Sequence, residues 1–184
     1  MKKIIPIIIA CLVCFASCST AKKTTSPPTD KSTPSVILTL EEMNIDKAFK
    51  KKQGKLPWPV SQGVKVFDYG THPHPNVPSV TVNNHGIDIE TAAGTPVRAI
   101  FQGEVTSVIE ILGKKVIMIR HGSFISVYQN VTDLLVKKGD KVKAKQTIAT
   151  VSKEDDSEQY ILHFELWENT SHVNPNHWLS KRIH

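Results

Sequence analysis

Short stretches of alternating apolar and polar residues recur from Leu56 to the end of the chain. They cover residues 64–67, 87–89, 97–100, 105–111, 115–119, 125–128, 147–151 and 160–167. Gly, Pro, Asn and Asp lie between them, as is typical of turns between strands. No long segment with helical periodicity interrupts the series. The pattern therefore predicts an all-β domain, a sandwich or a barrel-like sheet, rather than a parallel sheet with crossover helices.

One short helix is predicted ahead of these strands, within residues 39–53. Thr39 and Glu42 have the spacing of a capping box, and apolar residues follow at roughly helical intervals up to Phe49. Residues 18–38 are rich in Thr, Ser, Lys and Pro and show no apolar periodicity. Such a composition predicts a disordered tether between the N-terminus and the helix.

The N-terminus has the pattern of a secretion signal over residues 1–17. Lys2 and Lys3 precede the apolar run 4–16, which is shorter than the roughly 20 apolar residues that span a bilayer as a helix. All three cysteines of the chain lie within the first 18 residues, so the remainder can form neither a disulfide nor a thiolate metal site.

The signal ends in Phe15-Ala16-Ser17-Cys18, which resembles a bacterial lipobox, although Phe15 stands where Leu is usual. The resemblance implies that Cys18 receives lipid and becomes the mature N-terminus. It also implies a periplasmic protein anchored to the outer membrane of a Gram-negative bacterium, because Ser19 offers no retention aspartate. The alternative is a cleaved signal with an incidental cysteine.

The charge of the chain changes this picture little. The formal net charge is +6, and loss of the signal lysines leaves 21 basic and 17 acidic residues, a net charge of +4. A weakly basic surface favours approach to the anionic cell wall. The secretion signal argues against nucleic acid as a partner.

Four segments share a pattern with a known class of enzyme: 83–89 (Asn-Asn-His-Gly-Ile-Asp-Ile), 94–99, 103–105 and 162–165 (Leu-His-Phe-Glu). Together they resemble the LytM or lysostaphin-type zinc endopeptidases, which cut peptidoglycan cross-bridges. The resemblance implies a LytM-type β-sheet of the duplicated-hybrid-motif kind over residues 54–184. In that family, a His-x-Gly-Ile-Asp stretch supplies two zinc ligands, and a later His-x-His stretch supplies the third ligand and a catalytic histidine. A second catalytic histidine lies in a Tyr-x-His-Leu stretch between them.

On this chain the three zinc-ligand positions of the family fall on Asn84, Asp88 and His163, and the two catalytic positions on Asn130 and Ile161. A catalytic zinc takes three protein ligands and keeps one position for water, and asparagine is a poor zinc ligand. The resemblance therefore implies a degenerate metallopeptidase that is not an enzyme and has no cofactor. Asp88 and His163 remain weak metal candidates, and we expect them to hydrogen-bond each other or a neighbour.

Other histidines could replace the lost ligand. His85 is displaced by one residue from Asn84, so its side chain should point to the opposite face, away from Asp88. Gly86 is expected to permit a bend that brings the ligand positions together. His72 and His74 are further candidates, although we interpret them as loop residues that line the groove or face solvent.

Alternation within 161–166 predicts two faces for the last long strand. Leu162, Phe164 and Leu166 should face the core, and Ile161, His163 and Glu165 the former active-site groove. Trp58, Trp167 and Trp178 are also expected in the core.

The substitutions resemble those of the degenerate LytM domains in the EnvC-like murein hydrolase activators, over about residues 54–179. That resemblance implies a domain whose vacant groove binds and activates a periplasmic N-acetylmuramoyl-L-alanine amidase in peptidoglycan remodelling or cell separation. The implied docking positions are Asn84, Asp88, Asn130, Ile161, His163 and His74. Those activators carry a long N-terminal coiled coil, whereas here only residues 39–52 could be helical. The resemblance therefore does not imply recruitment to the division site through such a coiled coil.

Two alternatives stay open. One is a zinc-dependent peptidoglycan endopeptidase with substitute ligands, which requires three protein ligands to converge on one ion. The other is a plain peptidoglycan-binding module, which would bind purified wall without a partner protein.

Overall fold

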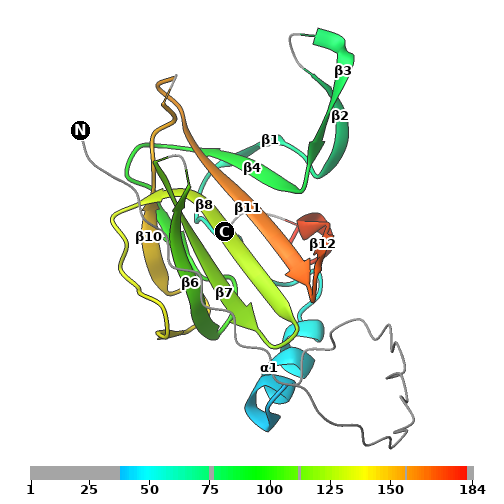
Figure 1. Ribbon diagram of the computed structural model, residues 1–184, viewed down its shortest axis with the longest axis vertical. Coiled ribbons are helices and arrows are strands. Elements are labelled where there is room, and N and C mark those ends of the chain that lie inside the picture. The colour runs from blue at the N-terminus through cyan, green and yellow to red at the C-terminus, as the bar shows by residue number, and fades with distance from the viewer. Residues whose placement is uncertain (1–37, 75–76, 112, 156, 182–184) are drawn as a thin grey trace, which may run out of the picture. The chain divides into compact units, whose positions relative to one another are not determined.

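The computed structural model describes residues 38–74, 77–111, 113–155 and 157–181. A single α-helix, α1 (Leu40–Lys50), precedes a series of strands and a final 3-10 turn, η1 (Pro175–His177) (Figure 1). The strands are β1 (Val64–Phe67), β2 (Gly70–His74), β3 (Val77–Asn84), β4 (Gly86–Thr91), β5 (Pro96–Arg98), β6 (Gly103–Ile111), β7 (Lys114–His121), β8 (Phe124–Thr132), β9 (Lys141–Val142), β10 (Thr147–Val151), β11 (Tyr160–Glu168) and β12 (Ser171–Val173). The all-β prediction is confirmed. The predicted signal peptide, Cys18 and nearly all of the predicted tether lie outside the described residues.

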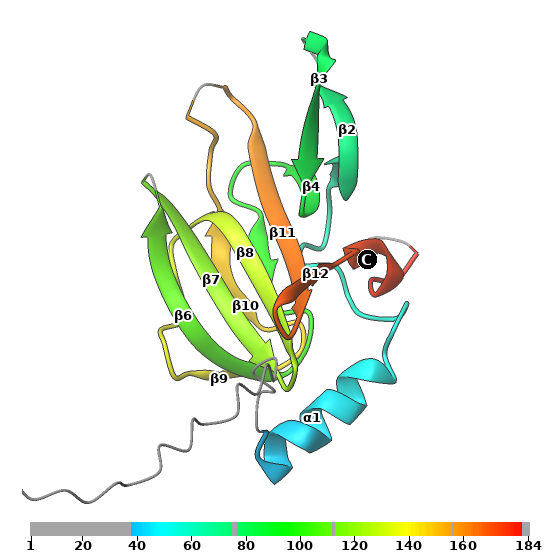
Figure 2. The same cartoon turned by 45° about the vertical axis from the view of Figure 1, so that its right-hand side comes forward.

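The main sheet is antiparallel and follows the order β1-β4-β11-β8-β7-β6-β9. Strand β10 pairs with β5 and β8, and β12 pairs with the end of β11. Strands β2 and β3 form a separate two-stranded hairpin that projects beyond the main sheet (Figures 1 and 2). Strand β11 therefore lies between β4 and β8, near the centre of the sheet.

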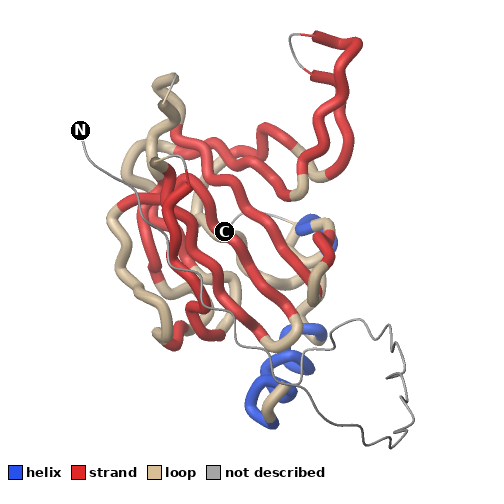
Figure 3. Tube along the Cα trace, viewed as in Figure 1, coloured by secondary structure: helices blue, strands red, loops and turns tan. Residues whose placement is uncertain are grey.

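All eight predicted strands are present, at β1, β4, β5, β6, β7, β8, β10 and β11, and strands rather than helices dominate the domain (Figure 3). Four strands were not predicted. Strands β9 and β12 are only two and three residues long, too short to show a period. The β2–β3 hairpin pairs only with itself and contains prolines, so its sequence lacks the alternation that one buried face imposes.

Helix α1 begins at the predicted capping box, where the Thr39 side chain accepts from the backbone of Glu42 and the Glu42 carboxylate accepts from Thr39. Phe49 fixes the other end of the helix to the domain. Its side chain is completely buried, and its ring stacks on Phe124 at 4.6 Å and on His121 at 5.2 Å between centroids. The helix is therefore a packed part of the fold rather than an extension of the tether.

The predicted division of faces in β11 is confirmed. The side chains of Leu162, Phe164 and Leu166 are fully buried, while those of His163 and Glu165 on the opposite face keep some exposure. Trp58 and Trp178 lie in the core. Trp167 is only half-buried, so the expectation that all three tryptophans are core residues is wrong for Trp167, which lies on the polar face of its strand.

Candidate functional site

Strand pairing brings together Asp88 and His163, two of the predicted zinc-ligand positions. In the antiparallel register, His163 of β11 is the direct partner of Asp88 in β4 and of Gln129 in β8. Direct partners on one face have Cβ atoms roughly 4.5–5.5 Å apart, which is within reach of a side-chain hydrogen bond. Strand pairing, not sequence proximity, therefore assembles the site.

The centre of the site is a chain of hydrogen bonds from Asp88 through His163 to Glu165. The Nδ1 atom of His163 lies 2.5 Å from Oδ1 of Asp88, and its Nε2 atom lies 3.1 Å from Oε1 of Glu165. The hydrogen bond expected between Asp88 and His163 is thus present. Both nitrogens of the imidazole are engaged by carboxylates.

This arrangement sets the charge of the histidine. Burial by itself lowers the pKa of His163, but the hydrogen bonds and negative charges of Asp88 and Glu165 outweigh it and raise that pKa to about 9. Burial raises the pKa of Glu165, yet its bonds to His163 and Trp167 bring it below the ordinary value. At neutral pH, His163 is therefore a cation between two carboxylates and donates from both nitrogens.

Glu165 connects this centre to a second group of side chains. Its Oε1 atom also accepts from Gln129 at 2.9 Å, and its Oε2 atom accepts from the indole of Trp167 at 2.7 Å. His172 of β12 lies against Trp167, with ring centroids 3.8 Å apart, and His85 lies against His172 at 4.1 Å. The three rings of Trp167, His172 and His85, which we call the aromatic shelf, border the site.

The aromatic shelf was not predicted from the sequence. Trp167 and Glu165 could have been found together, because alternation places both on the polar face of β11. His172 reaches them only because β12 folds back on the end of β11. His85 was expected to point away from Asp88, and its partners are Asn83, at 2.7 Å, and His172.

Asn84 forms a hydrogen bond with the backbone next to the site. Its side chain is only 6% exposed, and its Oδ1 atom accepts from the backbone N–H of Gly86 at 3.0 Å. The bond closes the turn at His85 between β3 and β4. Within the described residues, the Nδ2 atom of Asn84 has no hydrogen-bond partner.

Asn130 is likewise a framework residue. It is 5% exposed and adopts the left-handed conformation, with φ at 61°, which asparagine tolerates well. Its Nδ2 atom lies 2.7 Å from the carbonyl of Ile161 and 2.7 Å from Glu154, and it also reaches the carbonyl of Ser152 at 3.1 Å. The side chain therefore ties β8 to β11 and to the segment after β10.

Burial changes the expected docking surface. Asn84 and Asn130 were predicted to line an accessible groove, but both are committed to backbone groups and almost completely covered. The accessible positions are Asp88, whose side chain is 24% exposed, and His163, whose side chain is 26% exposed, together with the aromatic shelf. Ile161 is half-buried.

The histidines of the β2 segment do not complete the site. His72 bonds to the backbone oxygen of Asp68 at 2.9 Å, and its ring packs against Phe67. His74 lies at the end of β2, and its side chain is outside the described part of the chain. Its predicted place in the groove stays a prediction.

Gly86 has a different role from the one expected. A Cβ atom at this position would lie 2.3 Å from the backbone oxygen of Phe164, far inside van der Waals contact. The glycine is therefore needed for the close approach of β4 to β11. The change of direction between β3 and β4 occurs at His85.

Zinc does not fit the residues present. The side-chain oxygen of Asn84 accepts from the backbone N–H of Gly86, and both ring nitrogens of His163 are hydrogen-bonded to carboxylates. Over the described ranges, no three His, Cys, Asp or Glu side chains form a group that could hold a metal ion. The site instead presents hydrogen-bonding groups and aromatic rings.

Two cavities of the domain lie elsewhere. The larger has a volume of about 710 Å³ and lies beside α1, and the smaller, of about 260 Å³, is lined by residues that include Lys52, Pro57 and Phe101. Neither is lined by Asp88, His163 or the aromatic shelf. No helix in the part of the chain that the structure describes is long and apolar enough to cross a membrane.

Known proteins share this sequence pattern. The lipoprotein YgeR of Escherichia coli K12, itself uncharacterized, is 32% identical over 125 residues, which cover 66% of this chain and 46% of that protein. The NlpD/LppB homologue of Pseudomonas aeruginosa, also a lipoprotein, is 33% identical over 102 residues, which cover 54% of this chain and 34% of that protein. The chain thus spans less than half the length of both relatives.

Solved structures share the fold. A point mutant of the catalytic domain of EnpA, a prophage-encoded M23 protein of Enterococcus faecalis, is 30% identical with a TM-score of 0.55, covering 66% of this chain and 95% of that one. The family model for Peptidase family M23 matches residues 82–175, just over half of the 184 residues. Together with the LytM-type sheet and the position of the Asp88–His163 pair within it, this match shows that the chain belongs to peptidase family M23.

Proposed function

We propose that this chain is a non-catalytic member of its family that binds and activates a periplasmic N-acetylmuramoyl-L-alanine amidase during peptidoglycan remodelling or cell separation. The observation that carries the proposal is the engagement of His163 by Asp88 and Glu165. A side chain held in this way supplies recognition rather than hydrolysis. The resemblance to EnvC-like activators names the class of partner.

We place the docking surface on Asp88, His163 and the aromatic shelf. Tryptophan is enriched among the residues that dominate binding energy at protein interfaces, and Trp167 is half-exposed here with its indole N–H already satisfied by Glu165. The carboxylates of Asp88 and Glu165 together with the imidazolium of His163 leave one net negative charge. A segment with neutral or basic side chains would complement it.

Binding at this surface would activate an amidase only through a difference between two states of that enzyme. A ligand shifts a conformational equilibrium solely by its differential affinity for the two conformations. The domain must therefore bind the open, active state of the amidase more tightly than the closed state. A tenfold activation requires a preference of about 1.4 kcal/mol.

Location at the envelope is part of the same proposal. The relatives YgeR and NlpD/LppB are lipoproteins by name, and Cys18 has the setting of a lipidation site. We propose that a lipid at Cys18 holds the domain in the periplasm, at the outer membrane, within reach of the wall. The tether over residues 18–38 would provide that reach.

The test is release of dye from labelled peptidoglycan by each purified N-acetylmuramoyl-L-alanine amidase of the producing bacterium, with and without this protein. We expect the protein alone to release no dye and to accelerate one of the amidases. Trp167→Ala and His163→Ala should abolish the acceleration, whereas Lys138→Glu, an exposed charge elsewhere, should retain it.

Each contrary result has a distinct meaning. Dye release by the protein alone, dependent on added zinc, would favour the endopeptidase with substitute ligands. Sedimentation with purified wall, without effect on any amidase, would favour a plain peptidoglycan-binding module. Full activation by the Trp167→Ala and His163→Ala variants would place the docking surface elsewhere.

A further inference from the structure

A concave site lies on another part of the domain, between the N-terminal half of α1 and strands β6, β7 and β9. The cleft has a volume of about 710 Å³, within the range of roughly 300–1,000 Å³ that small-molecule sites occupy. Its lining includes Glu42, Glu104, Thr106, Arg120, Lys141 and Lys143. The family positions described above contribute nothing to it, so it is a separate site.

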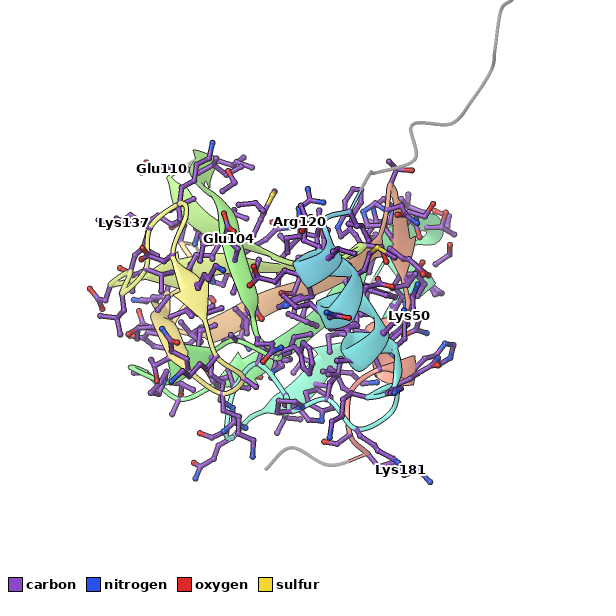
Figure 4. The ribbon with its side chains drawn as sticks, turned by 90° about the horizontal axis from the view of Figure 1, so that it is seen from below. Lys50, Glu104, Glu110, Arg120, Lys137 and Lys181 are labelled. Carbon is purple, nitrogen blue, oxygen red and sulfur yellow. The ribbon has the colours of Figure 1, made fainter. Side chains whose placement is uncertain are left out.

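Glu104 and Arg120 lie side by side on the floor of this cleft. They are direct partners in the β6–β7 register, and Figure 4 shows them close together near one end of α1, with Lys50 at the other end of the helix. Direct cross-strand partners have Cβ atoms roughly 4.5–5.5 Å apart and project to the same face of the sheet. Opposite charges at such positions usually form an ion pair.

Here that ion pair is not formed. Among the described residues, neither the guanidinium of Arg120 nor the carboxylate of Glu104 has a hydrogen-bond or ion-pair partner. Arg120 acts on Glu42 through its charge alone, and Glu104 does the same on Lys141, its direct partner in β9. The neighbouring charges are already committed. Glu41 pairs with Lys141 at 2.8 Å, and the Glu42 carboxylate accepts from Thr39.

The two free groups define the chemistry of a ligand. The guanidinium of Arg120 offers a fork of N–H donors that matches a carboxylate, and the carboxylate of Glu104 matches an ammonium group. Because the two side chains start from adjacent positions, the ligand must carry its carboxylate and its amino group close together. An amino group and a carboxylate on one carbon meet this requirement.

We infer that this cleft binds the free zwitterionic end of a diamino-dicarboxylic acid residue in a short peptide, with the carboxylate on Arg120 and the amino group on Glu104. The remaining volume of the cleft would accommodate the rest of the peptide, and Lys143 adds a further cation to its lining. Uncross-linked peptidoglycan stem peptides that contain diaminopimelate carry this group. The inference rests on the peptidoglycan role proposed above but not on amidase binding.

The test compares two tripeptides by titration calorimetry with the full chain in detergent: L-Ala-γ-D-Glu-meso-diaminopimelate, and the same peptide with L-Lys in the third position. The second peptide keeps the side-chain amine and lacks the carboxylate beside it. We expect the diaminopimelate peptide to bind at least about tenfold more tightly, the factor that a lost charge-assisted hydrogen bond produces. Equal affinity for the two peptides, or no binding of either, overturns the inference.

The chain provides a matched control for the variants. Glu110 and Lys115 are also direct partners in the β6–β7 register, and neither lines the cleft (Figure 4 labels Glu110). Arg120→Ala and Glu104→Gln should each weaken the diaminopimelate peptide about tenfold or more, and Glu110→Gln and Lys115→Ala should leave it unchanged. Wild-type affinity in Arg120→Ala overturns the assignment of the carboxylate.

The same experiments include controls for the folding of the variants and for the separate docking surface. If Arg120→Ala does not fold, as judged by its thermal transition, the comparison of the two peptides on the wild-type protein still decides the matter. Trp167→Ala should lose amidase activation and keep peptide binding, whereas Arg120→Ala should do the reverse. Failure of this inference is thereby distinguished from failure of the proposed function.

Discussion

His163 and Asp88 are cross-strand partners whose facing side-chain atoms, Nδ1 and Oδ1, lie 2.5 Å apart. The resemblance to zinc endopeptidases assigns both positions to metal ligands. Here the two side chains form a hydrogen bond with each other, and Glu165 accepts a hydrogen bond from the second nitrogen of the imidazole. A metal ion could bind His163 only by breaking one of these charge-assisted hydrogen bonds.

Zinc binding gives the first prediction. We expect elemental analysis of the purified protein to find zinc well below one atom per chain, and we expect no release of cross-link fragments from peptidoglycan. Asn84→His should raise zinc affinity without creating cleavage, because Asn130 and Ile161 occupy the positions that the resemblance assigns to the two catalytic histidines. One zinc per wild-type chain together with cross-link release would contradict this.

The close approach of β4 to β11 gives the second prediction. Gly86→Ala should lower the free energy of unfolding by about 2 kcal/mol or more, because its Cβ would overlap the backbone oxygen of Phe164. Urea denaturation measures the change. Gly94→Ala is the comparison: its added Cβ meets nothing within 4 Å, and only the positive φ of 71° opposes it, at a cost of about 1 kcal/mol.

His121 makes stability depend on pH. Complete burial lowers its pKa from 6.5 to about 4, although its bond to the carbonyl of Gln102 acts in the opposite direction. The unfolded chain therefore takes up a proton between pH 6.5 and 4 that the folded chain does not. The free energy of unfolding should fall across this interval by up to about 3 kcal/mol, with no further loss from this residue below pH 4.

The measurement is urea unfolding at several pH values between 7 and 4, for the wild-type protein and for His121→Gln. The variant will be less stable at pH 7, since it disturbs the buried bonds to Gln102 and Ser126. Its stability should decline less steeply towards pH 4. If the free energy of unfolding falls equally with pH in the two proteins, His121 does not have the lowered pKa that its burial predicts.

Helix docking gives the fourth prediction. Phe49→Ala should cost about 3–5 kcal/mol, because the ring is fully buried between Phe124, His121 and Trp178. Met43→Ala, in the same helix and 41% exposed, should change stability by about 0.5 kcal/mol or less. Thermal or urea unfolding tests both. Similar costs for the two variants would mean that the helix is not held by its Phe49 end.

Anchoring gives the last prediction. Cys18→Ser should release the protein from membranes without altering its unfolding transition, because the predicted tether over residues 18–38 would separate the cysteine from the folded domain. Fractionation after a carbonate wash measures retention. A single acyl chain anchors only marginally, so stable retention of the wild type requires more than one chain. Equal retention of variant and wild type would argue against lipidation.

The sequence by itself determined the features that depend on neighbours along the chain. The capping box at Thr39 fixed the start of α1, because its partners are three residues apart. Alternation in β11 fixed which side chains face the core and placed His163 and Glu165 together on the other face. A period of two assigns a side chain to a face, however, and does not say which strand lies beside it.

Only the tertiary structure decided what depends on pairing between distant segments. It buried Asn84 and Asn130 as framework residues, and it brought His172 onto Trp167. It also placed α1 beside Glu104 and Arg120, so that the helix and the two strands together line the cleft of about 710 Å³. Burial and charge pairing depend on the packed environment of a side chain. The same asparagine is therefore a surface contact in one fold and a buried framework residue in another.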